Sequence, residues 1–197
     1  KPLISYSIDI AQRSKLFQDV MVSTDDEEIA EIAIRYGASV PFFRSKKTSG
    51  DYATLADVIE EVIQQYKSRN LKYNYLCFIL PTAPLVLLKN LQKGLTMMKT
   101  KKFNSVRPLV RFSYPIQRAF RLENEIAEFM YPEFAKTRSQ DIEPAYHDAG
   151  QFYWMYFYKG LVPEKRGGFE IDELEAQDID NFTDLKIAEI KYNLINQ

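Results

Sequence analysis

Two aspartates, Asp178 and Asp180, stand one residue apart in the segment QDIDNFTDLKIAE, directly before a pattern typical of a helix. Alternate residues of an extended backbone point to the same face, so the two carboxylates would lie side by side. Two hard oxygen ligands with open coordination positions suit Mg²⁺ bound to phosphate groups. The alternative is structural, with Asp180 or Asn181 capping the helix and Asp178 solvated.

A second polar segment, FAKTRSQDIEPAYHDAG, carries Arg138, Gln140 and His147 and has little regular pattern. Recognition groups often lie in such loops. The planar guanidinium of Arg138 could bind an oxyanion through two hydrogen bonds, or it could pair internally with Asp141 or Glu143. His147, the only histidine, is either a binding group or a satisfied structural residue.

Composition limits what the elements around these residues can be. The chain has 197 residues, of which 46% are hydrophobic, and this is enough for the core of one domain. A net charge of −1 without a Lys/Arg-rich run disfavours a nucleic acid partner. A single cysteine, Cys77, excludes a disulfide framework and zinc fingers. No apolar stretch approaches the roughly 20 residues of a membrane span, so we expect a cytoplasmic protein without a membrane partner.

Short apolar runs alternate with helical patterns, which predicts an α/β domain with a parallel sheet. In the helix expected over residues 25–37, Ser23 or Thr24 is the predicted cap, Ile29 faces inward and Gly37 ends the helix. Thr54 has the capping-box spacing to Asp57. The expected strands are 19–24, 40–43, 73–80, 104–112 and 151–158, and the expected helices are 1–14, 25–37, 54–68, 88–100 and the segment after 181.

Residues 112–150 break this alternation and contain only two short β-like pieces, 118–123 and 125–130. We therefore predict an inserted arm. At the other end, residues 1–14 already have a helical pattern, whereas α/β nucleotide-binding folds usually open with a strand and a glycine-rich turn. We expect that strand and turn to lie upstream of Lys1.

Several segments in order, VMVSTDDEEIAEIAIRYGA, FILPTAPL, TRSQDIEPAYHDAGQFYW and QDIDNFTDLKIAEIKY, resemble the acylneuraminate cytidylyltransferase family, and within it the pseudaminic acid branch. The resemblance implies one domain over residues 1–197, a Rossmann-like, glycosyltransferase-A-like nucleotidyltransferase. It implies a three-layer sandwich with a mixed, mostly parallel sheet. It also implies that the arm, residues 112–150, forms a homodimer over the partner's active site; the arm could instead pack on its own domain.

The family transfers CMP from CTP to a nine-carbon α-keto acid sugar and releases pyrophosphate with the help of Mg²⁺. The resemblance makes Asp178 and Asp180 catalytic metal ligands. It makes Arg44, Asp51, Thr54 and Thr82 nucleotide-binding candidates. The alternatives are a solvated arginine for Arg44 and a helix cap for Thr54.

The sugar side differs from that of sialic acid relatives, because LPTAPLV places Leu80, Ala83 and Val86 where those relatives have Gln, Ser and Arg. A less polar pocket would fit pseudaminic acid, although Leu80 could equally belong to the core. The resemblance assigns Arg138 to phosphate or sugar-carboxylate binding and adds Gln140, although Ser139 is inserted relative to the family's Arg-Gln-x-x-x-Pro pattern. His147 in the loop and Gln151 at the start of the aromatic strand are further sugar-binding candidates. Other hypotheses are a sialic or legionaminic acid substrate, or a non-catalytic dimerising module.

Overall fold

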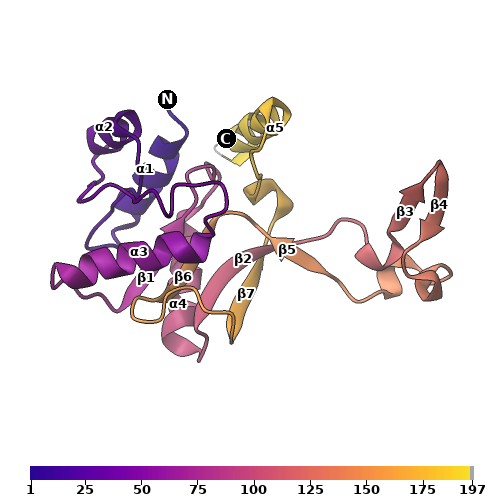
Figure 1. Ribbon diagram of the computed structural model, residues 1–197. Coiled ribbons are helices and arrows are strands. Elements are labelled where there is room, and N and C mark those ends of the chain that lie inside the picture. The colour runs from indigo at the N-terminus through magenta and orange to yellow at the C-terminus, as the bar shows by residue number, and fades with distance from the viewer. Residues whose placement is uncertain (196–197) are drawn as a thin grey trace.

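The computed structural model describes residues 1–195, and it shows a body of helices around one sheet with an arm extending from it (Figure 1). The expected α/β class is confirmed. The sheet contains β1 (Tyr75–Ile79), β2 (Ser105–Arg111), β5 (Tyr146–Asp148), β6 (Phe152–Tyr156) and β7 (Arg166–Ile171). The α-helices are α1 (Ile4–Ser14), α2 (Glu27–Arg35), α3 (Leu55–Ser68), α4 (Leu88–Thr100) and α5 (Phe182–Ile195).

The order of the strands explains why the sheet is mixed. β6 lies between β1 and β2 and is antiparallel to both, so β1 and β2 point in the same direction without pairing. β2 also pairs antiparallel with β5 and parallel with β7. The predicted mixed sheet is confirmed, but the expectation that it is mostly parallel is wrong, because only the β2–β7 pairing is parallel. The alternation of strands and helices did not reveal that the aromatic strand β6 returns between β1 and β2.

Two expected strands do not form. Residues 19–24 keep only one parallel bridge, from Met21 to Ser39, and residues 40–43 form no strand. Two backbone hydrogen bonds hold the bridge, from Val22 N to Ser39 O at 2.9 Å and from Ser39 N to Val20 O at 2.8 Å. Two real strands had no recognised signal, because β5 is short and polar and β7 contains paired glycines.

The helix termini follow local chemistry. In α3 the predicted capping box between Thr54 and Asp57 is confirmed. In α2 the cap is Asp26, whose side chain accepts from the backbone N–H of Ile29, so the expected cap at Ser23 or Thr24 is wrong. Ile29 is 42% exposed rather than inward-facing, because the smaller Ala30 and Ala33 make the buried contacts. The chain leaves α2 through Gly37, at φ +88°.

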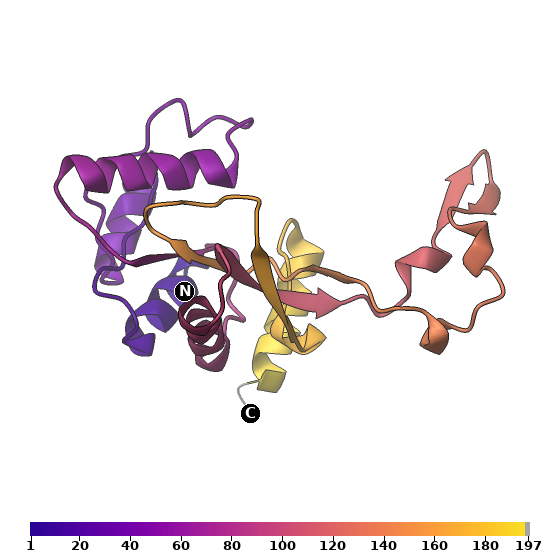
Figure 2. The ribbon, with the colours of Figure 1, turned by 90° about the horizontal axis from the view of Figure 1, so that it is seen from below.

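Alternate side chains of β6 supply two hydrophobic clusters, one on each face of the sheet. Phe152 and Trp154 pack in the cluster that contains residues of α4, whereas Tyr153 and Met155 pack in the cluster that contains residues of α3. Figure 2 shows α3 and α4 on opposite sides of the strands. Helix, sheet and helix therefore form the three predicted layers. No helix within residues 1–195 is long and apolar enough to cross a membrane.

The arm stands apart from the body in both views (Figures 1 and 2). Its outer part is an antiparallel hairpin of β3 (Phe120–Glu123) and β4 (Ile126–Phe129), with short 3₁₀ turns at Ile116–Arg118, Pro132–Phe134 and Ser139–Asp141. β5 falls inside the range 112–150 that we assigned to the arm, but it pairs with β2. The sheet therefore resumes before residue 150, earlier than expected.

Candidate active site

The two predicted metal ligands lie in the loop before α5, and neither of their carboxylates caps that helix. Asn181 caps α5, since its Oδ1 accepts from the backbone N–H groups of Thr183 at 2.9 Å and Asp184 at 3.2 Å. The Asp184 carboxylate in turn accepts from the backbone N–H groups of Asp180 and Asn181, each at 3.1 Å. This reciprocal arrangement satisfies the helix N-terminus. The cap is therefore Asn181, and the carboxylates of Asp178 and Asp180 are not part of it.

The two aspartates have the alternation of an extended segment, because Asp178 and Asp180 are exposed while Ile179 between them is half-buried. Neither carboxylate accepts a hydrogen bond from the described residues. Within residues 1–195 no group of three or more His, Cys, Asp or Glu side chains is placed to hold a metal ion. Two carboxylates fit Mg²⁺ only if phosphate groups and water supply its remaining ligands, and this is how Mg²⁺ is commonly bound.

A polar cluster that the sequence did not predict lies beside Asp178. A Cβ atom added to Gly150 would lie 3.7 Å from the Asp178 carboxyl carbon, so the loop passes close to the β5–β6 connection. Arg107 of β2 binds Asp148 with 2.9 Å between Nη1 and Oδ2, and its guanidinium lies 4.5 Å from the centre of the Tyr153 ring. Burial, then the negative charge of Asp148, raises the pKa of Tyr153 to about 12, and Asp178 contributes further. Arg107 and Tyr153 were missed because sequence patterns do not show which strands pair.

Three of the four predicted nucleotide-binding residues lie on or beside the loop that precedes α3. Arg44 is half-buried and pairs with Asp25, with 3.2 Å between Nη2 and Oδ1. Thr54 donates from its hydroxyl to Asp57 at 2.6 Å and accepts from the Asp57 backbone N–H, so the structure commits its side chain to the cap of α3. Asp51 is exposed. Thr82, on a different loop, is half-buried.

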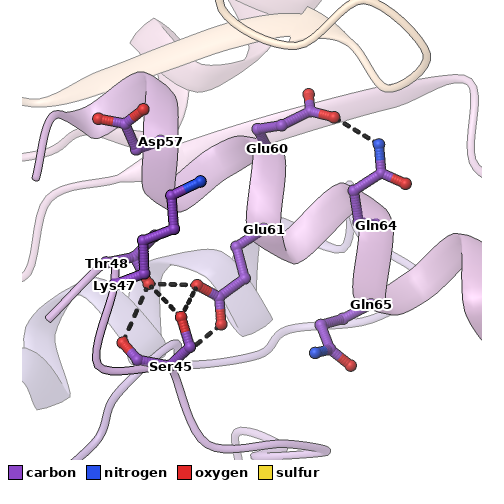
Figure 3. A pocket seen from close by; sticks show the side chains of 8 residues that line it. All are labelled: Ser45, Lys47, Thr48, Asp57, Glu60, Glu61, Gln64 and Gln65. Atoms are coloured by element: carbon purple, nitrogen blue, oxygen red, sulfur yellow. Dashed lines mark hydrogen bonds between the residues drawn. The ribbon is translucent and has the colours of Figure 1, made fainter.

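The carboxylate of Glu61, on α3, holds this loop through hydrogen bonds. Glu61 accepts from the backbone N–H and the hydroxyl of Ser45, both at 2.8 Å, and from the hydroxyl of the buried Thr48 (Figure 3). Burial opposes ionisation of Glu61, but the hydrogen bonds from Thr48 and Ser45 outweigh it and lower its pKa. The loop and α3 border a cavity of about 370 Å³, into which Lys47 and Glu60 also project.

The apolar substitutions in LPTAPLV mostly serve packing. Ala83 and Val86 are buried members of the cluster that includes α4, and Leu80 is half-buried against both hydrophobic clusters. The backbone of Leu80 is also fixed, since its N–H donates to Gln151 O at 2.9 Å and its carbonyl accepts from the Ser7 hydroxyl at 2.8 Å. The core alternative for Leu80 is therefore the one that its contacts support.

Gln151, expected to face a sugar, is only 1% exposed. Its amide nitrogen donates to the backbone carbonyl of Glu175, which lies in the turn that precedes the aspartate pair. Gln151 lies just before β6, and its burial and hydrogen bond do not favour direct contact with a sugar, which stays a prediction.

The remaining sugar-binding candidates lie on the arm and at its root. Arg138 is exposed and forms no ion pair with Asp141 or Glu143 within the described chain. Gln140 lines a cavity of about 570 Å³ at the root of the arm, which Glu173 also borders. His147 is exposed on β5, with its Nδ1 at 2.9 Å from the Asp148 carbonyl and its ring packed on Phe112.

Two bacterial proteins are similar to this chain in sequence over nearly its whole length. The protein "Pseudaminic acid cytidylyltransferase" of Campylobacter jejuni subsp. jejuni serotype O:2 is 38% identical over 200 residues, covering 98% of this chain and 86% of that protein. A Helicobacter pylori protein named "Pseudaminic acid cytidylyltransferase and UDP-2,4-diacetamido-2,4,6-trideoxy-beta-L-altropyranose hydrolase" is 30% identical over 195 residues, covering 96% of this chain and 37% of that one.

Solved structures share the fold at low sequence identity. The structure of CMP:2-keto-3-deoxy-manno-octonic acid synthetase complexed with CTP aligns with a TM-score of 0.67 and 13% identity, over 100% of this chain and 88% of that one. A 4-diphosphocytidyl-2C-methyl-D-erythritol synthase from Anaerococcus prevotii aligns with a TM-score of 0.61 and 11% identity, over 98% and 88% of the two chains. These likenesses confirm the nucleotidyltransferase fold. The family model described as "Cytidylyltransferase" matches residues 1–161, and the chain belongs to the cytidylyltransferase family.

Proposed function

We propose that this protein transfers CMP from CTP to pseudaminic acid, a nine-carbon α-keto acid sugar, with release of pyrophosphate. The names of the relatives that match nearly the whole chain support the substrates. The structural observation that carries the proposal is the cap of α5 by Asn181, which leaves Asp178 and Asp180 as two exposed carboxylates without hydrogen-bond donors in the described chain.

Asp178 and Asp180 would hold Mg²⁺. A bound Mg²⁺ neutralises charge on the triphosphate, which is the main demand of phosphoryl transfer. Thr82 and the loop that contains Arg44 and Asp51 would bind the nucleotide. Because the Thr54 hydroxyl is engaged by the cap of α3, its contribution would be to fix that loop rather than to contact the nucleotide.

The arm would complete the sugar site in a homodimer. Arg138 and Gln140 lie on the arm and His147 at its return to the sheet. Arg138 forms no ion pair within residues 1–195, and its guanidinium would bind the sugar carboxylate. Leu80 would act indirectly, by keeping the end of β1 apolar beside the sugar. The exposed apolar side chains of the arm support an interface with a second copy.

The test measures pyrophosphate release by the full-length protein with CTP, Mg²⁺ and either pseudaminic, legionaminic or N-acetylneuraminic acid. We expect release with pseudaminic acid, and a loss of at least about 100-fold in the Asp178→Asn/Asp180→Asn variant, because Mg²⁺ loses both protein charges. The matched control is Glu189→Gln, an exposed acid on α5, which should keep full activity. Release with another sugar alone would replace the substrate, release with none would favour a non-catalytic module, and an active double variant would refute the metal site.

A further inference from the structure

The turn that precedes Asp178 contains a buried carboxylate that the proposed reaction does not use. Glu175 ends the 3₁₀ turn Glu173–Glu175 and is only 9% exposed. Its Oε2 accepts from the side-chain amide of the buried Asn90 at 2.8 Å, and its Oε1 pairs with the ammonium group of Lys89. Both partners lie at the start of α4, so this carboxylate ties the loop to a helix of the core.

The backbone of the same turn is held from two further elements. Gln151 of the β5–β6 connection donates its amide to Glu175 O, and Lys191 of α5 donates to Glu173 O at 2.9 Å and to Ala176 O at 2.7 Å. Side chains from three places in the chain therefore converge on residues 173–176. Asp178 follows two residues later, in a stretch without regular secondary structure.

Stability alone does not account for this arrangement of polar groups. The ion pair of Glu175 with Lys89 gives little net stability, because the Lys89 side chain is exposed to solvent. The Gln151 Oε1 atom is buried without a hydrogen-bond partner among the described residues, which adds a desolvation cost. What the network provides is a fixed position for the backbone, and Mg²⁺ requires that of its ligands because it demands near-ideal octahedral geometry.

We propose that Glu175 is a positioning residue that holds the loop so that Asp178 and Asp180 meet the metal in a fixed geometry. This inference rests on the proposed function and deepens it. Gln151, which we expected at the sugar, belongs to the same network. It would therefore help to place the metal ligands.

The experiment compares Glu175→Gln, which keeps the shape but removes the charge, with Glu189→Gln as the matched control. Loss of a group that orients metal ligands typically costs about 10–100-fold in metal affinity or activity. We expect a loss of that size in kcat and in the apparent affinity for Mg²⁺, with KM for CTP little changed at saturating Mg²⁺. Wild-type kcat and Mg²⁺ dependence in the variant would overturn the proposal.

Two further measurements separate this proposal from the proposed function and from simple misfolding. Amide hydrogen exchange at Glu175, Ala176 and Asp180, whose N–H groups are hydrogen-bonded, should be faster in Glu175→Gln in the absence of substrates. Unchanged exchange would overturn the proposal even if wild-type protein releases no pyrophosphate. Lys89→Met removes one partner from an exposed site and should shift exchange and the Mg²⁺ dependence in the same direction. A variant whose apparent kcat falls only in proportion to lost folded protein, with the Mg²⁺ dependence unchanged, would also refute a positioning role.

Discussion

The loop of residues 172–181 and the arm both have irregular sequences, yet within residues 1–195 side-chain hydrogen bonds hold the loop, and not the hairpin of the arm, against the body. The loop is tied to α4, to the β5–β6 connection and to α5 by side chains from each. The arm stands off the body, and Leu122 and Ile126 on its hairpin are 73% and 62% exposed. Its ring contact between Phe120 and Phe129, with centroids 4.2 Å apart, is internal to the hairpin.

The comparison shows that a single copy of the chain can hold the loop in place but provides little to hold the arm. A loop held by buried hydrogen bonds has its geometry set within one copy, whereas an isolated two-stranded hairpin is at best marginally stable in water. An exposed apolar surface of this kind is typical of an interaction site. We therefore expect the arm to pack on a second copy, as in the proposed homodimer, whereas the loop needs no second copy to hold its position.

The largest effect on unfolding is expected in the body. Leu91→Ala removes a fully buried side chain of α4 that packs in the cluster containing Trp154. We expect a loss of about 2–5 kcal/mol in the free energy of unfolding, because the methyl groups leave a cavity. Urea denaturation followed by circular dichroism measures it. A loss below about 1 kcal/mol would show that the body is more loosely packed than the structure indicates.

A smaller effect is expected where the arm returns to the sheet. Gly150 has φ +63°, in the left-handed region, so Gly150→Ala should cost about 1–2 kcal/mol in unfolding free energy. The control is Gly50→Ala, where φ is not positive and no atom lies within 4 Å of the added carbon. Equal stabilities of the two variants would mean that the turn at Gly150 is not fixed in this conformation.

The cap of α5 can be checked by two neighbouring substitutions. Asn181→Ala should lower the unfolding free energy by about 1 kcal/mol, because the N–H groups of Thr183 and Asp184 lose their acceptor. Asp180→Ala should leave stability unchanged, since that carboxylate is not part of the cap. Thermal denaturation of both variants decides the assignment, and the reverse order would make Asp180 the cap.

Acid should loosen the loop that Glu61 holds. The pKa of Glu61 in the folded protein lies below its ordinary value of 4.5, so its ionised form stabilises the fold at neutral pH. This contribution is lost as the pH falls below that value towards the lowered pKa. Wild-type protein should therefore lose slightly more stability between pH 6 and pH 3 than Glu61→Gln does. Parallel stability curves for the two proteins would contradict the lowered pKa.

Local patterns predicted much of the fold and less of the site. The capping box at Thr54 and the turn at Gly37 depend on neighbouring residues, so the sequence was sufficient for them. The pairing of Arg107 with Asp148 depends on which strands pair and in which register, and this is set by the whole sheet. For the same reason Gln151 was assigned to a sugar, although tertiary packing directs it towards Glu175.

The smallest effect on unfolding is expected in the arm, where the comparison with the body is sharpest. Leu122→Ser/Ile126→Ser should change the unfolding free energy by no more than about 0.5 kcal/mol per site, because both side chains are already exposed. If the hairpin meets a second copy, the same variant should weaken self-association measured by analytical ultracentrifugation. Ile34→Ser, an exposed apolar residue on α2, is the matched control and should leave association unchanged. Association that survives in the arm variant would place the interface elsewhere, and an unfolding cost like that of Leu91→Ala would show that the arm packs against its own chain.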